Sequence, residues 1–103
     1  MKFVNLTPHT INLNDGRSFE SQGVARVETD FTEIDKNGFC NQVFGFVLGL
    51  PDVQPNTFLI VSGMVFGATS RQDVIAPATG HPDTTRNEKG HIVSVPGFIR
   101  KEV

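Results

Sequence analysis

The chain has 103 residues, a net charge of −2 and a single cysteine, Cys40. This length suits one domain, residues 1–103, and the slightly acidic balance disfavours nucleic-acid binding, which normally uses a net basic face. One cysteine allows no intramolecular disulfide, and we expect Cys40 to be a small buried residue. The longest apolar run, residues 57–68, is too short for a membrane span of ~20 residues, and the opening residues lack a signal-peptide core. We therefore expect a cytoplasmic protein without membrane or nucleic-acid partners.

Short strands separated by turns dominate the first third of the chain. Residues 3–6 form an apolar strand that ends at Thr7-Pro8, because proline cannot donate to a sheet. Residues 10–13 and 17–20 flank Asn14-Asp15-Gly16, which predicts a hairpin with a type I′ turn. Residues 23–29 alternate again, so that Ala25 and Val27 share one face.

The middle of the chain predicts a second hairpin. Residues 32–34 favour a helical turn, and Asn37-Gly38 is a typical hairpin dipeptide. Residues 39–48 then form a strand rich in Phe and Val. Gly45 in its centre predicts a bulge or a close backbone approach.

A central strand and the only helix follow. Residues 58–61 are continuously apolar and β-branched, which favours a strand covered on both faces. Ser62 can cap a short helix over residues 63–68, with Met64, Val65 and Ala68 on one face.

Three more strands are expected at residues 71–75, 91–95 and 98–100. The chain has nine Phe but no Tyr or Trp, and we expect most of these rings in the core. The predicted fold is mainly β (α+β), a single small barrel- or sandwich-like domain with one short helix.

The polar segment of residues 73–90 is the main candidate for a binding site. It has no obvious strand or helix, and long irregular loops in compact domains are often functional. It holds Thr79-Gly80, Thr84-Thr85 and Arg86, and Arg71 precedes it. Hydroxyls, backbone N–H groups and guanidinium groups suit a phosphate oxygen. The competing interpretation is that both arginines pair with nearby carboxylates on the surface.

Histidines and the opening polar motif offer weaker signals. Asn5, Thr7 and His9 could line a rim beside this loop, and His81 lies within it. The histidine spacings are too long for a typical zinc motif, and no nucleophile elbow is present. We therefore assign no catalytic residue, no metal and no cofactor.

The sequence resembles a family of small uncharacterised proteins of bacteriophages, prophages and bacteria. The resemblance rests on the opening Asn5-Leu6-Thr7-Pro8-His9 motif, residues 23–27, Ile60-Val61-Ser62, and single positions from Val65 to Gly90. Members often have Tyr before the Ile-Val-Ser run, where this chain has Phe58-Leu59. The resemblance implies a phage context but no established reaction. By analogy alone, small phage proteins of this size include sponges for nucleotide immune signals such as those of Thoeris and CBASS.

Three functions are compatible with the sequence. The first is a homo-oligomer, in the host cytoplasm if phage-encoded, that sequesters a nucleotide-like signalling molecule to counter host defence, without turnover. The second is a small phosphodiesterase or hydrolase with His81 or His91 as general acid or base. The third is an inhibitor of another protein or a phage accessory protein. For the first, the predicted ligand-binding residues are Arg71, Thr79, Gly80, His81, Thr84, Thr85, Arg86, Asn5 and His9.

Overall fold

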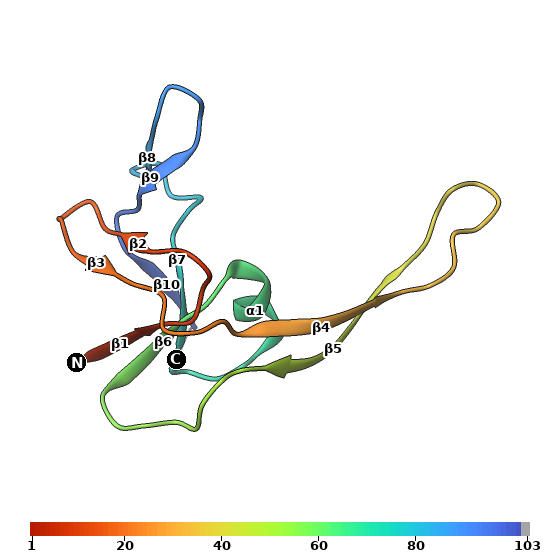
Figure 1. Ribbon diagram of the computed structural model, residues 1–103, viewed down its shortest axis with the longest axis horizontal. Coiled ribbons are helices and arrows are strands. Elements are labelled where there is room, and N and C mark those ends of the chain that lie inside the picture. Colours follow the sequence, from red (N-terminus) through yellow and green to blue (C-terminus); the bar gives the residue numbers. More distant parts are fainter. Residues whose placement is uncertain (102–103) are drawn as a thin grey trace.

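In the computed structural model, which describes residues 1–101, two hairpins project from a small body of sheet and helix (Figure 1). Ten strands and one helix make up these parts. They are β1 (Lys2–Asn5), β2 (Ile11–Asn12), β3 (Ser18–Phe19), β4 (Arg26–Phe31), β5 (Gln42–Leu48), β6 (Thr57–Ile60), α1 (Gly63–Ala68), β7 (Val74–Pro77), β8 (Thr85–Arg86), β9 (Ile92–Ser94) and β10 (Phe98–Arg100).

A four-stranded sheet in the order β1-β6-β7-β10 forms the body. β1, β6 and β7 run parallel, and β10 runs antiparallel to β7 at one edge. β6, α1 and β7 form a strand–helix–strand unit, the usual connection between parallel neighbours. Leu59, Ile60 and Val61 are almost completely buried, which confirms the central strand expected from the apolar run.

One face of this sheet carries the aliphatic core. Leu59, Val61 and Val74 pack there with Val65 of α1 and Val27 of β4. The predicted cap is confirmed, because the Ser62 hydroxyl oxygen accepts the Val65 N–H at 3.4 Å. The predicted helix face is wrong, since Met64 and Ala68 are exposed. A helix of six residues is less than two turns long, and in α1 only the Val65 side chain is buried against the sheet.

The opposite face of the sheet is aromatic. The Phe3 ring stacks on Phe58 and Phe98, and Phe19 from β3 packs edge-on against Phe3. None of the nine Phe side chains is fully buried, so the expectation that most lie in the core is wrong. The strands of the β2–β3 hairpin have two residues each, so this hairpin is too small to cover the aromatic face of the sheet completely.

The turn of the β2–β3 hairpin differs from the expected type. The Gly16 N–H donates to the Leu13 carbonyl at 3.0 Å, and Gly16 has a φ of 96°. A type I′ turn needs a positive φ at both central residues, but among residues 1–101 only Asn56 combines a side chain with a positive φ. The turn is therefore tightened by Gly16 alone.

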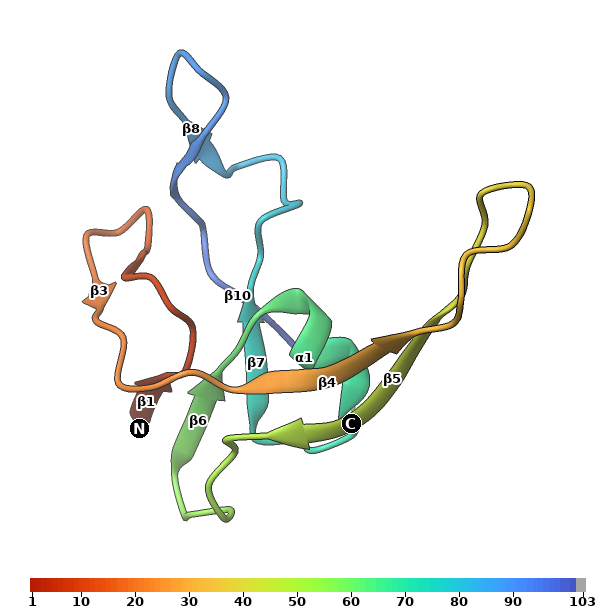
Figure 2. The same ribbon diagram turned by 45° about the vertical axis from the view of Figure 1, so that its right-hand side comes forward.

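β4 and β5 form a long antiparallel hairpin whose outer part stands clear of the body in both ribbon views (Figures 1 and 2). Its register shifts between Val27 and Thr29, opposite Gly45. The predicted bulge is therefore confirmed, and a Cβ on Gly45 would lie 3.1 Å from the Glu28 side chain. Residues 32–34 form no helical turn, and Cys40 is exposed rather than buried. Nothing packs on this hairpin that could bury a thiol.

Residues 73–90 are more regular than predicted. They begin with the buried strand β7 and include β8, which pairs with β9 in a second projecting hairpin. The irregular part is the stretch from Ala78 to Thr84, which leaves the sheet at the end of β7. The polar residues of β8 resemble loop residues in sequence because both faces of that short strand are exposed.

The prediction of a mainly β fold with one short helix is confirmed. Among the described strands, none of the sheets closes into a barrel. No helix within residues 1–101 has the length and hydropathy needed to cross a membrane.

Two glycines give a matched test of the fold. Gly49 has a φ of 86°, and a Cβ there would lie 2.7 Å from the Val24 carbonyl oxygen. We expect Gly49→Ala to destabilise the protein by at least about 2 kcal/mol, because left-handed strain and a backbone clash add. Gly67 in α1 has open space around it, so Gly67→Ala should stabilise by about 0.5–1 kcal/mol. Urea unfolding followed by circular dichroism measures both, and equal effects would contradict this account.

Candidate functional site

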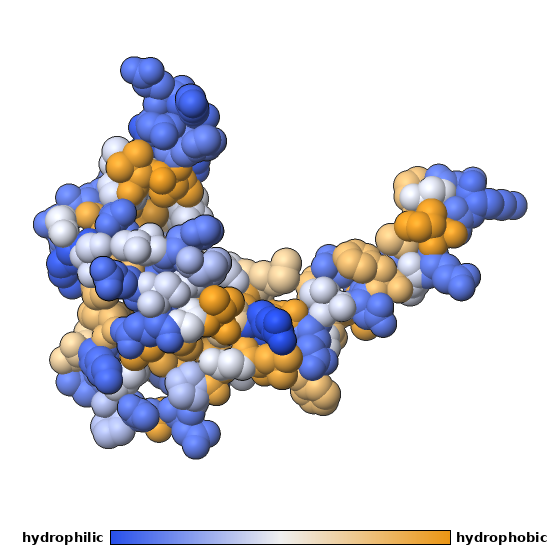
Figure 3. Space-filling view, in the orientation of Figure 1, coloured by the Kyte–Doolittle hydropathy of each residue, from blue (hydrophilic) through white to orange (hydrophobic). Residues whose placement is uncertain are grey.

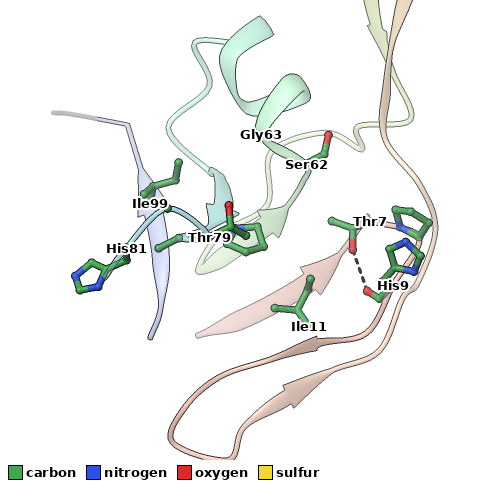
Figure 4. A pocket seen from close by; sticks show the side chains of 12 residues that line it. Thr7, His9, Ile11, Ser62, Gly63, Thr79, His81 and Ile99 are labelled. Atoms are coloured by element: carbon green, nitrogen blue, oxygen red, sulfur yellow. Dashed lines mark hydrogen bonds between the residues drawn. The ribbon is translucent and has the colours of Figure 1, made fainter. Parts of the chain in front are cut away.

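A pocket of about 650 Å³ opens where the parallel strands β1, β6 and β7 end (Figure 4). Ligands of open α/β sheets commonly bind outside the carboxyl ends of the strands. Three chain segments meet at this edge: the turn after β1, the start of α1 after β6, and the loop after β7. The lining residues are Thr7, Pro8, His9, Ile11, Ser62, Gly63, Pro77, Ala78, Thr79, Gly80, His81 and Ile99.

The first wall is held in place by Asn5, whose side chain is completely buried. Its Nδ2 donates to the carbonyl oxygens of His9 and Phe19, both at 2.8 Å. Its Oδ1 accepts the Thr7 backbone N–H at 2.9 Å and lies 2.7 Å from the Thr7 hydroxyl. The amide is thereby saturated, so its structural part in the site is to position the turn that carries Thr7, Pro8 and His9.

The opposite wall is the loop after β7. Thr79 and Ile99 face Thr7 and Ile11 across the pocket, and the His81 ring points away from the Thr7 side (Figure 4). His81 Nδ1 accepts the Asp83 N–H at 3.0 Å. A neutral imidazole that accepts at Nδ1 carries its proton on Nε2, so His81 offers a donor at the rim.

The chemistry of the lining is apolar with a few hydroxyl and imidazole groups. No Arg, Lys, Asp or Glu is among the described residues that line it. Ser62 accepts a backbone N–H and keeps its own proton for donation. Apolar walls with a few directed polar groups are typical of small-molecule sites. Neither Ser62 nor a threonine of the lining is hydrogen-bonded to an imidazole within residues 1–101, and nucleophilic catalysis needs such a pairing.

Arg86 lies outside the pocket and braces its own hairpin. Its guanidinium donates to the Gly90 carbonyl at 3.0 Å and to the Thr79 carbonyl at 3.4 Å. The Thr84 hydroxyl donates to the Ala78 carbonyl, and the Thr85 hydroxyl lies 3.3 Å from the Asn14 side-chain oxygen. These contacts fix how the β8–β9 hairpin and the β7 loop leave the sheet.

Arg71 lies in a separate hollow that does not share a lining residue with the pocket. Its guanidinium forms two hydrogen bonds with the Asp73 carboxylate, at 2.7 and 3.0 Å. This pairing with Asp73 raises the pKa of Arg71 further above its usual value. Arg71 therefore forms a structural ion pair with Asp73, as the competing interpretation of the sequence expects.

The structure brings together four of the nine predicted site residues: His9, Thr79, Gly80 and His81 all line the pocket. Thr7 and His9 do lie across from the loop, as the rim interpretation required. Sequence reasoning missed the apolar part of the lining. For Pro8, Gly63 and Ala78, the available signal was a position shortly after an apolar strand. The missed residues are Pro8, Ile11, Gly63, Pro77, Ala78 and Ile99.

No group of three or more His, Cys, Asp or Glu side chains is placed to hold a metal ion in the part of the chain that the structure describes. His9 and His81 line the same pocket, but two imidazoles without a third protein ligand are fewer than zinc sites commonly use.

Comparison with known proteins returned no matching family model, no matching curated protein and no matching solved structure.

The Asn5 amide provides the test of how the site is held. Asn5→Ala should destabilise the protein by about 3 kcal/mol or more, because the buried Thr7 N–H and the partly buried Phe19 carbonyl lose their partner and a cavity replaces the amide. Asn12→Ala is the control, since its side chain makes one exposed hydrogen bond to Ser18 and should cost under about 1 kcal/mol. Denaturant unfolding compares the two. A loss for Asn5→Ala no larger than the control would refute the anchoring role.

Proposed function

We propose that this chain is a binding protein that captures a small planar molecule, such as the base of a nucleotide-like signal, without turning it over. The carrying observation is the pocket at the ends of β1, β6 and β7. It is apolar on most sides and presents a few polar groups, the Ser62 hydroxyl among them. Apolar walls favour a flat ring system, and the polar groups can read its polar edge.

The charged part of such a ligand would lie at the mouth of the pocket. Gly80 lines it with open space around its Cα, and its backbone N–H forms no hydrogen bond with another described residue. A free backbone N–H suits an anionic oxygen. Arg86 is near enough to donate to the Thr79 carbonyl, so a phosphate could compete for its guanidinium. In the wider proposal, that signal is a host defence molecule and the chain sequesters it for a phage.

Capture without turnover fits the lack of charge in the lining better than hydrolysis does. A general base works when its proton acceptor reaches the attacking group. The Nδ1 atom of His81 is occupied by the Asp83 N–H, and its ring points away from the Thr7 side.

A retained ligand is the first expected result. The chain has no Tyr or Trp, so the purified protein should absorb only weakly unless a chromophore is bound. We expect an absorption band near ~260 nm that survives gel filtration and leaves with the small-molecule fraction on denaturation. Mass spectrometry then identifies the released compound. An unchanged mass after prolonged incubation supports capture, whereas conversion to products would show an enzyme.

A pocket-filling variant tests where the ligand binds. Gly80→Phe adds a ring to the lining at a position where a Cβ meets no atom within 4 Å. We expect at least a roughly tenfold loss of affinity, or ~1.4 kcal/mol, for the released ligand or for a panel of cyclic mono- and dinucleotides. Gly67→Phe is the matched control, because Gly67 is equally open but lies on α1 outside the pocket.

Titration calorimetry measures the ligand affinity of both variants and shows whether the ligand binds in this pocket or elsewhere. Equal affinities of Gly80→Phe and the unaltered protein would exclude this pocket. Arg71→Ala serves as a second control for the predicted residues, since Arg71 is paired with Asp73 in another hollow.

A further inference from the structure

The outer part of the β4–β5 hairpin, residues 28–46, is exposed at every position. We call this segment the arm. It carries six large apolar side chains that are between 52% and 79% exposed. Figure 3 shows apolar surface along its length, between polar residues. These apolar residues are Phe31, Ile34, Phe39, Val43, Phe44 and Phe46.

The arm is an ordered element and not a loose loop. At its tip, the Asp35 carboxylate accepts the N–H groups of Asn37 and Phe39 at 2.9 and 3.0 Å. The Thr32 hydroxyl oxygen accepts the Asn41 N–H at 2.8 Å. Gly38 turns the chain with a φ of 90°. The tip therefore satisfies much of its own backbone hydrogen bonding while it buries almost no apolar surface.

Such an arm gains little stability by itself. An isolated two-stranded hairpin is marginally stable in water, and it becomes stable when a third strand is added or another element packs on its apolar side chains. The radius of gyration is 15.8 Å, against about 13 Å for a compact domain of this size. Apolar patches of this extent usually mark an interaction surface.

We propose that the arm packs on the body of a second copy of this chain, in a reciprocal exchange that forms a closed dimer. The area fits this occupant. At more than half exposure, six such side chains leave about 600 Å² of apolar surface in water. If about half of this area is buried, on one face of each arm, two arms and the two surfaces that receive them would together bury about 1,200 Å², which reaches the range of specific interfaces.

Charge indicates the body, and not the other arm, as the receiving surface. Residues 28–46 contain four carboxylates, those of Glu28, Asp30, Glu33 and Asp35, but only one cation, Lys36. Two arms laid against each other would bring carboxylates of like charge together, which is unfavourable at an interface. A receiving surface should therefore be aromatic and cationic.

The uncovered part of the aromatic sheet face has this character. Phe3, Phe58 and Phe98 line a groove of about 270 Å³, and Arg17 and Arg100 line it as well. We call it the aromatic groove. Its volume is below the usual range for small-molecule sites and suits an inserted side chain. The Arg100 guanidinium lies 5.8 Å from the centre of the Phe58 ring.

Arg100 is the cation available for the arm. It forms no salt bridge with any described residue, whereas Arg17 is paired with Asp15 at 2.9 Å. A Phe of the arm can stack on the groove while a neighbouring carboxylate meets Arg100, and this pairing gives both attraction and register. The groove shares no lining residue with the pocket beside His9 and His81, so the dimer and the ligand site can fail independently.

Sedimentation equilibrium of the full chain tests the dimer. We expect a mass of twice 11.3 kDa through the micromolar range. Phe46→Ser should raise the dimer dissociation constant about tenfold or more. The control is Val93→Ser on β9, which removes an exposed apolar side chain outside the arm and should leave the constant unchanged. A species of 11.3 kDa at all these concentrations, or equal effects of both substitutions, would overturn the proposal and leave the arm for a different protein.

A mixing experiment tests the receiving surface. Arg100→Glu should weaken the dimer because it places a carboxylate where the acidic arm docks. When Phe46→Ser and Arg100→Glu proteins are mixed, the intact arm of one meets the intact groove of the other. Where each substitution abolishes the contact that it touches, each variant alone is monomeric and keeps no contact, whereas the mixed dimer keeps one, so we expect the mixture to associate. No association between two variants that are each monomeric alone would refute arm-to-groove packing and indicate that arms pair with each other. Circular dichroism of each variant confirms that it is folded.

Discussion

The buried amide of Asn5 determines where the first wall of the pocket lies. It forms hydrogen bonds to the turn after β1 and to the end of β3, two segments that are not strands of the four-stranded sheet. A buried amide must satisfy both its donors and its acceptor, because each unmet group costs free energy in the interior. These hydrogen bonds hold the turn that carries Thr7, Pro8 and His9 in place. The opening polar motif is thus a structural device as well as a boundary of the pocket.

The local features of the sequence predicted local structure well. The apolar run at residues 58–61, the Ser62 cap and the Gly45 bulge all follow from chemistry within a few residues. Long-range pairing could not be predicted in the same way. β1 pairs with β6 across more than fifty residues, and no periodicity in either strand indicates its partner. The exposure of the arm could not be predicted either, since a Phe-rich sequence predicts a core strand whether or not another element covers it.

The pocket shows why residue type alone is a weak guide to a binding site. The guanidinium groups of Arg71 and Arg86 suit a phosphate, yet each donates to acceptors within the chain, Asp73 in one case and backbone carbonyls in the other. The sequence contained those acceptors but not the geometry that selects them. The strand ends are a better guide in this protein, because parallel strands bring distant segments such as Thr7, Ser62 and Thr79 to one edge.

The parallel pairing of β1 with β6 also sets an order in which the chain can fold. The unit from Thr57 to Pro77 is contiguous and can form early, as can the β4–β5 hairpin. β1 must wait, because its partner is separated from it by a loop whose closure is entropically unfavourable. During synthesis, β1 therefore lacks its sheet partner until β6 has left the ribosome. Contacts of high sequence separation slow folding, so docking of the first strand is expected to be the late step that completes both the sheet and the pocket.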